Sequence, residues 1–234
     1  MSINANVDRA KTDYDRAYEA GKKSEYDAFW DAFQQNGWRE DYERAFGGQG
    51  WTDKTFTPKY DIVPIGYSAQ TFHGSRVVDL AACLEKSGVT LDTSKSHYLG
   101  QFAQESWIQR MPVIDMSYSN QSSVIDTQYA FGYSAVVSFE KIIFSEWTIF
   151  ANTFIGCTSL VDLPVEGTIG QNGFSVQWST KLTHESLMSI INALADKSAD
   201  TSGTVWTVTL GSDNIAKLSE EEQRIAKQKG WTLA

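Results

Sequence analysis

Three carboxylates and one hydroxyl each stand at or near the end of a short β-prone run. The runs cover 89–92, 113–116, 142–145 and 163–166, and the polar residues are Asp92, Asp115, Ser145 and Glu166. Two neighbouring carboxylates can hydrolyse a glycoside by acid–base catalysis, and several together can bind Ca²⁺. Any water-exposed sheet edge needs polar residues as well, so we favour a structural role and predict no metal site.

Residues that could act as nucleophiles or metal ligands are few and far apart. The histidines are His73, His97 and His184. None lies in an HExxH motif, and no serine lies in a GxSxG element. The glycines of 47–50 and 167–173 lack the spacing of a phosphate-binding loop. Cys83 and Cys157 are expected to be buried thiols. We therefore predict no catalytic residue, no cofactor and no enzymatic activity.

Aromatic residues give a stronger signal than the titratable ones. The chain contains eight Trp and ten Tyr. Five of them fall in or near the loops between the β-prone runs: Trp107, Tyr118, Tyr129, Tyr133 and Trp147. Large flat side chains give a surface contact area at low entropic cost, for proteins or for sugar rings. We predict that these residues bind a ligand; the alternative is that about half of them fill gaps between irregular units.

Charge argues against two classes of partner. The chain has 29 acidic and 20 basic residues and a net charge of −9. Nucleic-acid binding relies on clustered Lys and Arg, and so does docking on an anionic membrane surface. No apolar run approaches the length of a membrane span, and residues 1–15 do not read as a signal peptide. We expect synthesis in a cytoplasm, no membrane insertion and no nucleic-acid partner.

The first 50 residues are expected to be helical and to mediate assembly. Apolar or small residues recur at heptad spacing: Ile3, Val7, Ala10, Tyr14 and Ala17. This seam predicts a short coiled coil and a homo-oligomer, with a trimer favoured; the alternative is an amphipathic helix on its own domain. Residues 51–72, in which prolines alternate with apolar residues, read as an extended linker.

Beyond the linker, an aromatic residue recurs at intervals of 20 to 30 residues. These residues are Phe72, Phe102, Phe131, Phe154 and Phe174. A β-prone run lies between most successive members, and a helix is predicted over 77–86. Each unit is too short to bury its own apolar face, so the units are expected to stack and share one core.

One unit carries a recognisable pattern. Residues 154–164 read FIGCTSLVDLP, which resembles the F-x-x-C-x-x-L-x-x-L-P unit of BspA-like (treponemal-type) leucine-rich repeats. Residues 179–234 resemble the terminal module found on this repeat type in proteins of gut Firmicutes and their phages. Residues 18–37 and 45–62 resemble the N-terminal part of the same phage or prophage proteins.

The resemblance implies an α/β fold in four parts. A helical attachment region (1–50) and the linker (51–72) precede a leucine-rich-repeat solenoid with irregular units (73–178). An α/β capping module follows (179–234). In that module Thr183 is expected to N-cap a helix, 204–210 to form a strand, and Ser219 and Glu222 to form a capping box.

The resemblance also implies a non-enzymatic phage virion protein of a tail tip, fibre or baseplate. Its N-terminal helices would contact other virion proteins, and its repeat domain would bind a glycan or protein on the host surface. The alternative is a structural virion component, such as a capsid decoration or baseplate spacer, with no ligand.

Overall fold

The computed structural model describes residues 62, 66–67, 71–94, 96–117 and 124–234. The predicted coiled-coil seam, the helices of 1–50, most of the linker and Tyr118 lie outside these residues. The structure therefore bears on the region from Phe72 to the C-terminus.

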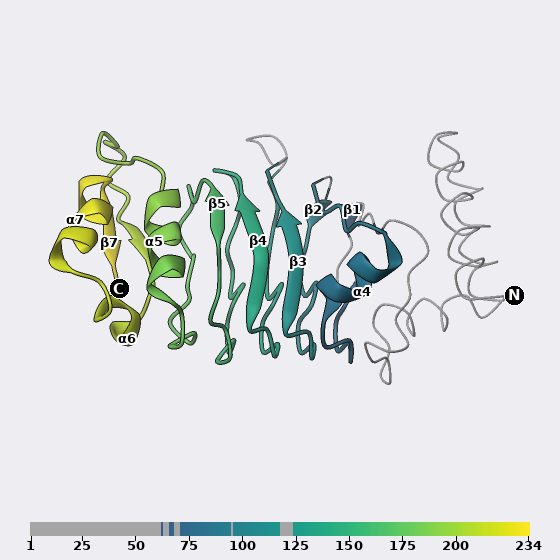
Figure 1. Ribbon diagram of the computed structural model, residues 1–234. Coiled ribbons are helices and arrows are strands. Elements are labelled where there is room, and N and C mark those ends of the chain that lie inside the picture. Colours follow the sequence, from purple (N-terminus) through teal and green to yellow (C-terminus); the bar gives the residue numbers. More distant parts are fainter. Residues whose placement is uncertain (1–61, 63–65, 68–70, 95, 118–123) are drawn as a thin grey trace, which may run out of the picture.

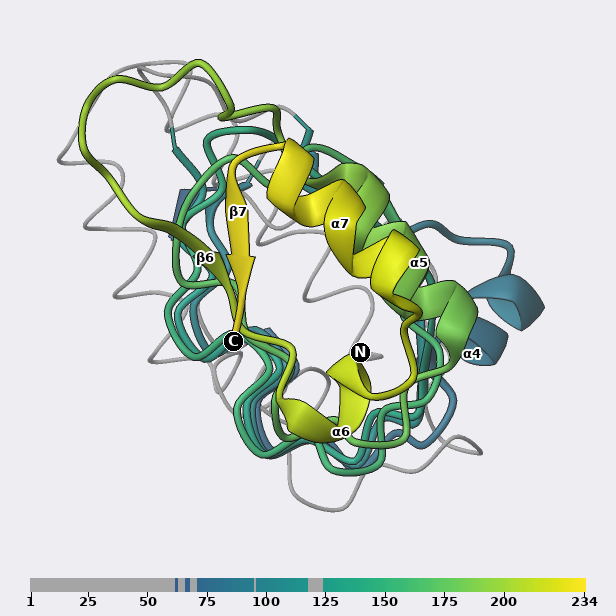
Figure 2. The same ribbon diagram turned by 90° about the vertical axis from the view of Figure 1, so that its left-hand side faces the viewer.

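The described chain consists of short strands, with short helices between some of them (Figure 1). The elements are β1 Gly66–Tyr67, α4 Leu80–Ser87, β2 Ser96–Tyr98, β3 Arg110–Asp115, β4 Ser138–Phe144, β5 Val165–Gly167, α5 His184–Ala193, β6 Trp206–Val208, α6 Ser212–Ile215, α7 Glu220–Gln228 and β7 Trp231–Leu233. Viewed from the C-terminal end, successive turns of the chain lie over one another around a shared interior (Figure 2). In this view α5 and α7 lie on one side, with β6 and β7 opposite.

The prediction of a leucine-rich-repeat solenoid with an α/β cap is wrong. The described strands form three small parallel sheets, in the orders β1-β2, β3-β4-β5 and β6-β7. Such a solenoid would need one ladder that gains a strand with every unit. At the breaks, neighbouring segments share only single parallel bridges, such as Asp79–Arg110 and Ile169–Leu194.

Helices cause the breaks between the sheets. Asp79, which makes the single bridge to Arg110, is also the N-cap of α4, and its side chain accepts from the Ala82 N–H at 2.8 Å. The chain therefore turns into a helix where a further strand beside β3 would begin. Leu194, at the second break, is the C-cap of α5. The helix predicted over 77–86 is thus present, but it interrupts the sheet.

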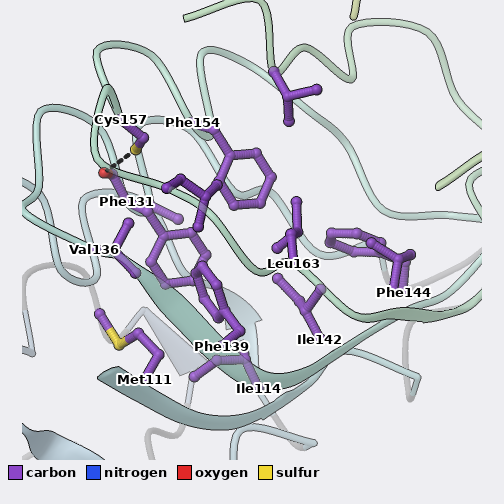
Figure 3. Close-up of a cluster of buried hydrophobic side chains, with 14 of the residues drawn as sticks. Met111, Ile114, Phe131, Val136, Phe139, Ile142, Phe144, Phe154, Cys157 and Leu163 are labelled. Carbon is purple, nitrogen blue, oxygen red and sulfur yellow. Dashed lines mark hydrogen bonds between the residues drawn. The ribbon is translucent and has the colours of Figure 1, made fainter. Parts of the chain in front are cut away.

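The middle sheet positions most of the core. Register places Ile114 of β3 opposite Ile142 of β4, and Ile142 opposite Val165 of β5. All three side chains are buried. Parallel pairing in register brings equal positions of successive strands to the same face. The buried apolar residues of β3, β4 and β5 therefore form one continuous layer (Figure 3).

A row of phenylalanines crosses the interior beside this sheet. Its members are Phe72, Phe102, Phe131, Phe154 and Phe174, all fully buried. Ring centroids of successive members lie 5.3, 6.3, 5.5 and 5.8 Å apart. Edge-to-face and stacked rings at these separations stabilise a core beyond their area burial. The recurring aromatic residues of the sequence are therefore core residues.

Helix α5 covers the open edge of β5. Ser186 Oγ accepts from the Leu163 N–H at 2.8 Å, and Ser189 Oγ accepts from the Val165 N–H at 3.0 Å. Ser189 Oγ also lies 3.1 Å from the Leu163 carbonyl oxygen. A sheet edge that leaves its N–H groups unpaired can pair with another chain. Two hydroxyls one helical turn apart thus take the place of a fourth strand.

We expect Ser186→Ala to lower the free energy of unfolding by about 1–3 kcal/mol, because the buried Leu163 N–H loses its acceptor. Urea denaturation monitored by tryptophan fluorescence measures this change. Ser198→Ala, at an exposed loop position, is the matched control and should change the free energy by less than about 0.5 kcal/mol. Equal effects of the two substitutions would contradict the role of Ser186 at the edge.

The helix caps predicted for the C-terminal region are present, and the strand predicted over 204–210 is limited to β6, Trp206–Val208. Thr183 caps α5 by accepting from the Ser186 N–H, and Ser219 and Glu222 form the capping box of α7. Gly230, just past α7, has a φ of +82°. Lys229 Nζ donates to three carbonyls at the C-terminal end of α5, at 2.7 to 3.2 Å. Burial lowers the pKa of Lys229. This ammonium ties α5 to the end of α7.

Candidate functional site

The carboxylates at the ends of the β-prone runs accept hydrogen bonds within their own turns. Asp92 Oδ1 accepts from the Ser94 N–H at 3.0 Å and from the Ser94 hydroxyl at 2.6 Å. Asp115 Oδ1 accepts from the Ser117 N–H at 2.8 Å. Ser145 Oγ accepts in the same way from the Trp147 N–H at 3.0 Å. These are local turns in which a short polar side chain satisfies the backbone two residues on.

Glu166 differs, because it pairs with Lys141 of the neighbouring strand at 2.8 Å. Register places Ile143 between Asp115 and Glu166, so the two carboxylates stand two strands apart, roughly 10 Å at the spacing of sheets. Within the described residues, no group of three or more His, Cys, Asp or Glu side chains could hold a metal ion. The geometry supports the structural interpretation of these residues.

Among the residues that the structure describes, three large aromatic residues are at least half exposed. The exposed fractions are 52% for Trp107, 55% for Tyr133 and 50% for Trp178. Trp107 and Tyr133 were predicted as ligand-binding residues, and Trp178 was not. Of the other candidates, Tyr129 and Trp147 are half-buried. Tyr118 lies outside the described residues.

Backbone hydrogen bonds align the turns that carry these side chains. The Glu105 N–H donates to the Gly132 carbonyl at 2.9 Å, and the Tyr133 N–H donates to the Ile155 carbonyl at 2.7 Å. Glu105, Tyr133 and Gly156 therefore occupy the same place in three successive turns. The Trp107 N–H donates to the Ser75 carbonyl at 2.8 Å, one turn earlier.

A row of small buried polar residues lies next to these positions and also connects successive turns. It consists of Ser75, Ser106, Ser134, Cys157 and Ser179. Ser134 Oγ lies 3.8 Å from Cys157 Sγ, and Ser179 Oγ donates to the Cys157 carbonyl at 3.0 Å. Cys157 Sγ donates to the Phe131 carbonyl at 3.0 Å (Figure 3).

The exposed aromatic residues adjoin this polar row in sequence. Tyr133 and Trp178 stand directly before Ser134 and Ser179, and Trp107 directly follows Ser106. The three residues therefore lie at one edge of the stacked turns, with Trp107 two positions further along its turn than Tyr133 and Trp178 are in theirs. We call Trp107, Tyr133 and Trp178 the aromatic row. The position before a buried serine is the sequence signal that could have identified Trp178.

Two non-glycine residues at this edge hold a left-handed backbone. Glu105 and Tyr133 have φ of +57°, at the place where Gly74 and Gly156 have +63° and +70°. Such a backbone costs a residue with a Cβ about 1–2 kcal/mol, whereas glycine adopts it freely. The turns of Gly74 and Gly156 thus use glycine at this place, and the turns of Glu105 and Tyr133 do not. Gln101, Tyr129 and Asn152 also hold a left-handed backbone, so this conformation is a regular feature of the turns.

The rings of the aromatic row have defined supports. A Cβ added to Gly156 would lie 2.5 Å from Tyr133 Cδ1, so the Tyr133 ring lies against the backbone of Gly156. The Arg76 guanidinium lies 4.0 Å from the centroid of the Trp107 ring, in a cation–π contact. The rings of Tyr133 and Trp107 are thereby held on one side, while more than half of each residue remains exposed to solvent.

The buried thiol of Cys157 makes the free energy of unfolding depend on pH in the alkaline range. Burial raises the pKa of Cys157 from 9.0 to about 11. Above pH 9 the unfolded chain loses this proton while the folded chain keeps it, so the free energy of unfolding falls as the pH rises toward 11. We expect Cys157 to contribute a loss of up to about 2 kcal/mol over this window.

Cys157→Ser is the matched variant for this effect, because serine occupies the same place in the neighbouring turns. The variant should lose less stability between pH 9 and 11 than the original chain, measured by urea denaturation at each pH. Native Cys157 should also resist alkylation at pH 8 until the chain is unfolded. Parallel stability profiles for the two chains would contradict the assignment.

Comparison with protein-family models, with curated proteins and with solved structures finds no match for this chain. Among the helices that the structure describes, none is long and apolar enough to cross a membrane.

Proposed function

We propose that this chain is a non-enzymatic binding protein of a phage virion, and that its aromatic row contacts a polymer or protein on the bacterial host surface. The observation that carries the binding function is the exposure of Trp107, Tyr133 and Trp178 along one edge. Trp and Tyr are the residues that most often dominate the binding energy of an interface.

The exposure of Tyr133 supports the same conclusion. Its ring packs on the backbone of Gly156, and the residue is still 55% exposed. A role in contact with a ligand explains why a large flat side chain occupies this position. The turn-forming roles of Asp92 and Asp115 support a protein without catalytic carboxylates.

The virion setting rests on the resemblance of 18–37, 45–62 and 179–234 to phage proteins. In this proposal residues 1–50 attach the chain to other virion proteins and form a homo-oligomer. Light scattering on the full chain and on a version that begins at Lys54 tests this part. A trimer that becomes a monomer on truncation supports it, and a monomer in both cases contradicts it.

Simultaneous replacement of Trp107, Tyr133 and Trp178 by Ala should weaken binding to host cell walls at least tenfold, because at least about 1.4 kcal/mol of contact energy is lost. Binding is measured by pull-down with walls from a panel of gut Firmicutes. The control replaces Val113, Ile149 and Val205 by Ala, which removes exposed apolar residues outside the row.

The control variant should bind as the original chain does, and both variants should keep their circular dichroism spectra. Failure of the original chain to bind any wall would contradict the proposed function. Virions that carry the aromatic variant and still adsorb normally would instead favour a structural component of the particle.

A further inference from the structure

We infer that the ligand of the aromatic row is a linear polysaccharide that runs across successive turns, with its sugar rings stacked on Trp107, Tyr133 and Trp178. This inference rests on the proposed binding function. It names the ligand class of the same site.

The exposed rings do not form one apolar patch. On the row of equivalent turn positions, Glu105 precedes Tyr133, and Gly156 separates Tyr133 from the turn of Trp178. Protein interfaces concentrate their energy in a contiguous, desolvated centre surrounded by a rim. Rings that stand apart, with a carboxylate or a glycine between them, suit a ligand whose own flat faces recur along a chain.

The spacing of the turns has the scale of such a polymer. Neighbouring turns joined by backbone hydrogen bonds are about 4.8 Å apart, so the backbones of Tyr133 and Trp178 are separated by roughly 10 Å. Trp107 lies one turn before Tyr133 and extends the row in the same direction. A chain of sugars laid along this edge can contact all three rings.

Polar groups beside the rings can pair with sugar hydroxyls. Exposed side chains flank the row at Glu105, Thr158, Gln177 and Thr180. They offer a carboxylate, an amide and two hydroxyls, which together both donate and accept hydrogen bonds. The Arg76 guanidinium on Trp107 adds donors at one end of the row. Mixed donors and acceptors around flat aromatic faces match a ligand rich in hydroxyl groups.

The test determines whether the ligand on bacterial cell walls is a glycan or a protein. It uses walls that bind the original chain before treatment. Walls are oxidised with periodate, which cleaves the vicinal diols of sugars, or digested with proteinase K. Pull-down of the original chain and of the triple alanine variant then measures capture. We expect periodate to reduce capture of the original chain at least tenfold and proteinase K to change it less than twofold.

Soluble wall polysaccharide, fractionated by length, provides the second measurement. Longer fragments should compete better for the original chain until they span the three rings, after which competition should level off. For Trp178→Ala, which removes the last ring, the levelling should occur at a shorter length. Capture lost to proteinase K but not to periodate would overturn the inference and leave the binding function standing. No capture by any untreated wall would instead contradict the proposed function itself.

Discussion

Replacement of Phe131 by Ala is expected to lower the free energy of unfolding by about 3–5 kcal/mol. Phe131 is fully buried at the centre of the phenylalanine row. Its ring centroid lies 4.9 Å from that of Phe139, 5.5 Å from that of Phe154 and 6.3 Å from that of Phe102. Alanine would leave a cavity between rings that come from three turns, and neighbours fixed by backbone hydrogen bonds cannot close it.

Urea denaturation followed by circular dichroism measures this loss. The matched control is Tyr133→Ala, two residues away in the same turn, where an exposed ring is removed and no cavity forms. Its effect should stay within about 1 kcal/mol. A loss of less than about 1 kcal/mol for Phe131→Ala would show that the row is not the centre of the core.

Gly167→Ala is expected to destabilise the chain by at least about 2 kcal/mol more than Gly203→Ala. The two glycines share a left-handed backbone, with φ of +75° and +81°. Their surroundings differ. A Cβ at Gly167 would overlap the carbonyl oxygen of Phe144 in the neighbouring strand, whereas a Cβ at Gly203 meets nothing within 4 Å.

Because both substitutions carry the same backbone strain of about 1–2 kcal/mol, their difference isolates the steric term. Thermal unfolding of the two variants under identical conditions provides the comparison. Equal destabilisation would mean that β5 can shift away from β4 at no cost, and so that the close contact at Phe144 does not restrain the sheet.

Local signals predicted the helix caps of the C-terminal region. The cap at Thr183 and the capping box of Ser219 and Glu222 depend on residues within one helical turn of each other, and both are present. The recurring phenylalanines were also read correctly as places where turns share a core. In each of these cases the residue types act through neighbours in sequence or through burial alone.

The arrangement of the sheets could not be predicted, because it depends on contacts between distant residues. A regular ladder follows from the repeat pattern only if each unit supplies a strand. Here the N-cap of Asp79 diverts one segment into α4, and α5 occupies the place beside β5. That Ser186 and Ser189 would accept from strand N–H groups 23 and 24 residues earlier is not encoded in their local sequence.

The candidate site was likewise predicted only in part from the sequence. The sequence singled out Trp107 and Tyr133 because they fall outside the β-prone runs, and both are exposed. It missed Trp178, whose place becomes evident only when Ser179 is seen to bond to the Cys157 carbonyl. The strand-end carboxylates had the right position for a shared site, but the hydrogen bonds of Asp92 and Asp115 direct them to their own turns.

The hydroxyls of Ser186 and Ser189 on the edge of β5 also bear on how the folded chain aggregates. While α5 is in place, the middle sheet has no free N–H groups at Leu163 or Val165 to template another molecule. Detachment of α5 would expose both at once beside a freshly uncovered apolar layer. Lys229 donates hydrogen bonds to the carbonyls at the C-terminal end of α5. We therefore expect it to oppose detachment of this helix and the aggregation that would follow. The lifetime of the soluble protein is expected to follow the opening rate of this one helix more closely than the stability of the whole fold.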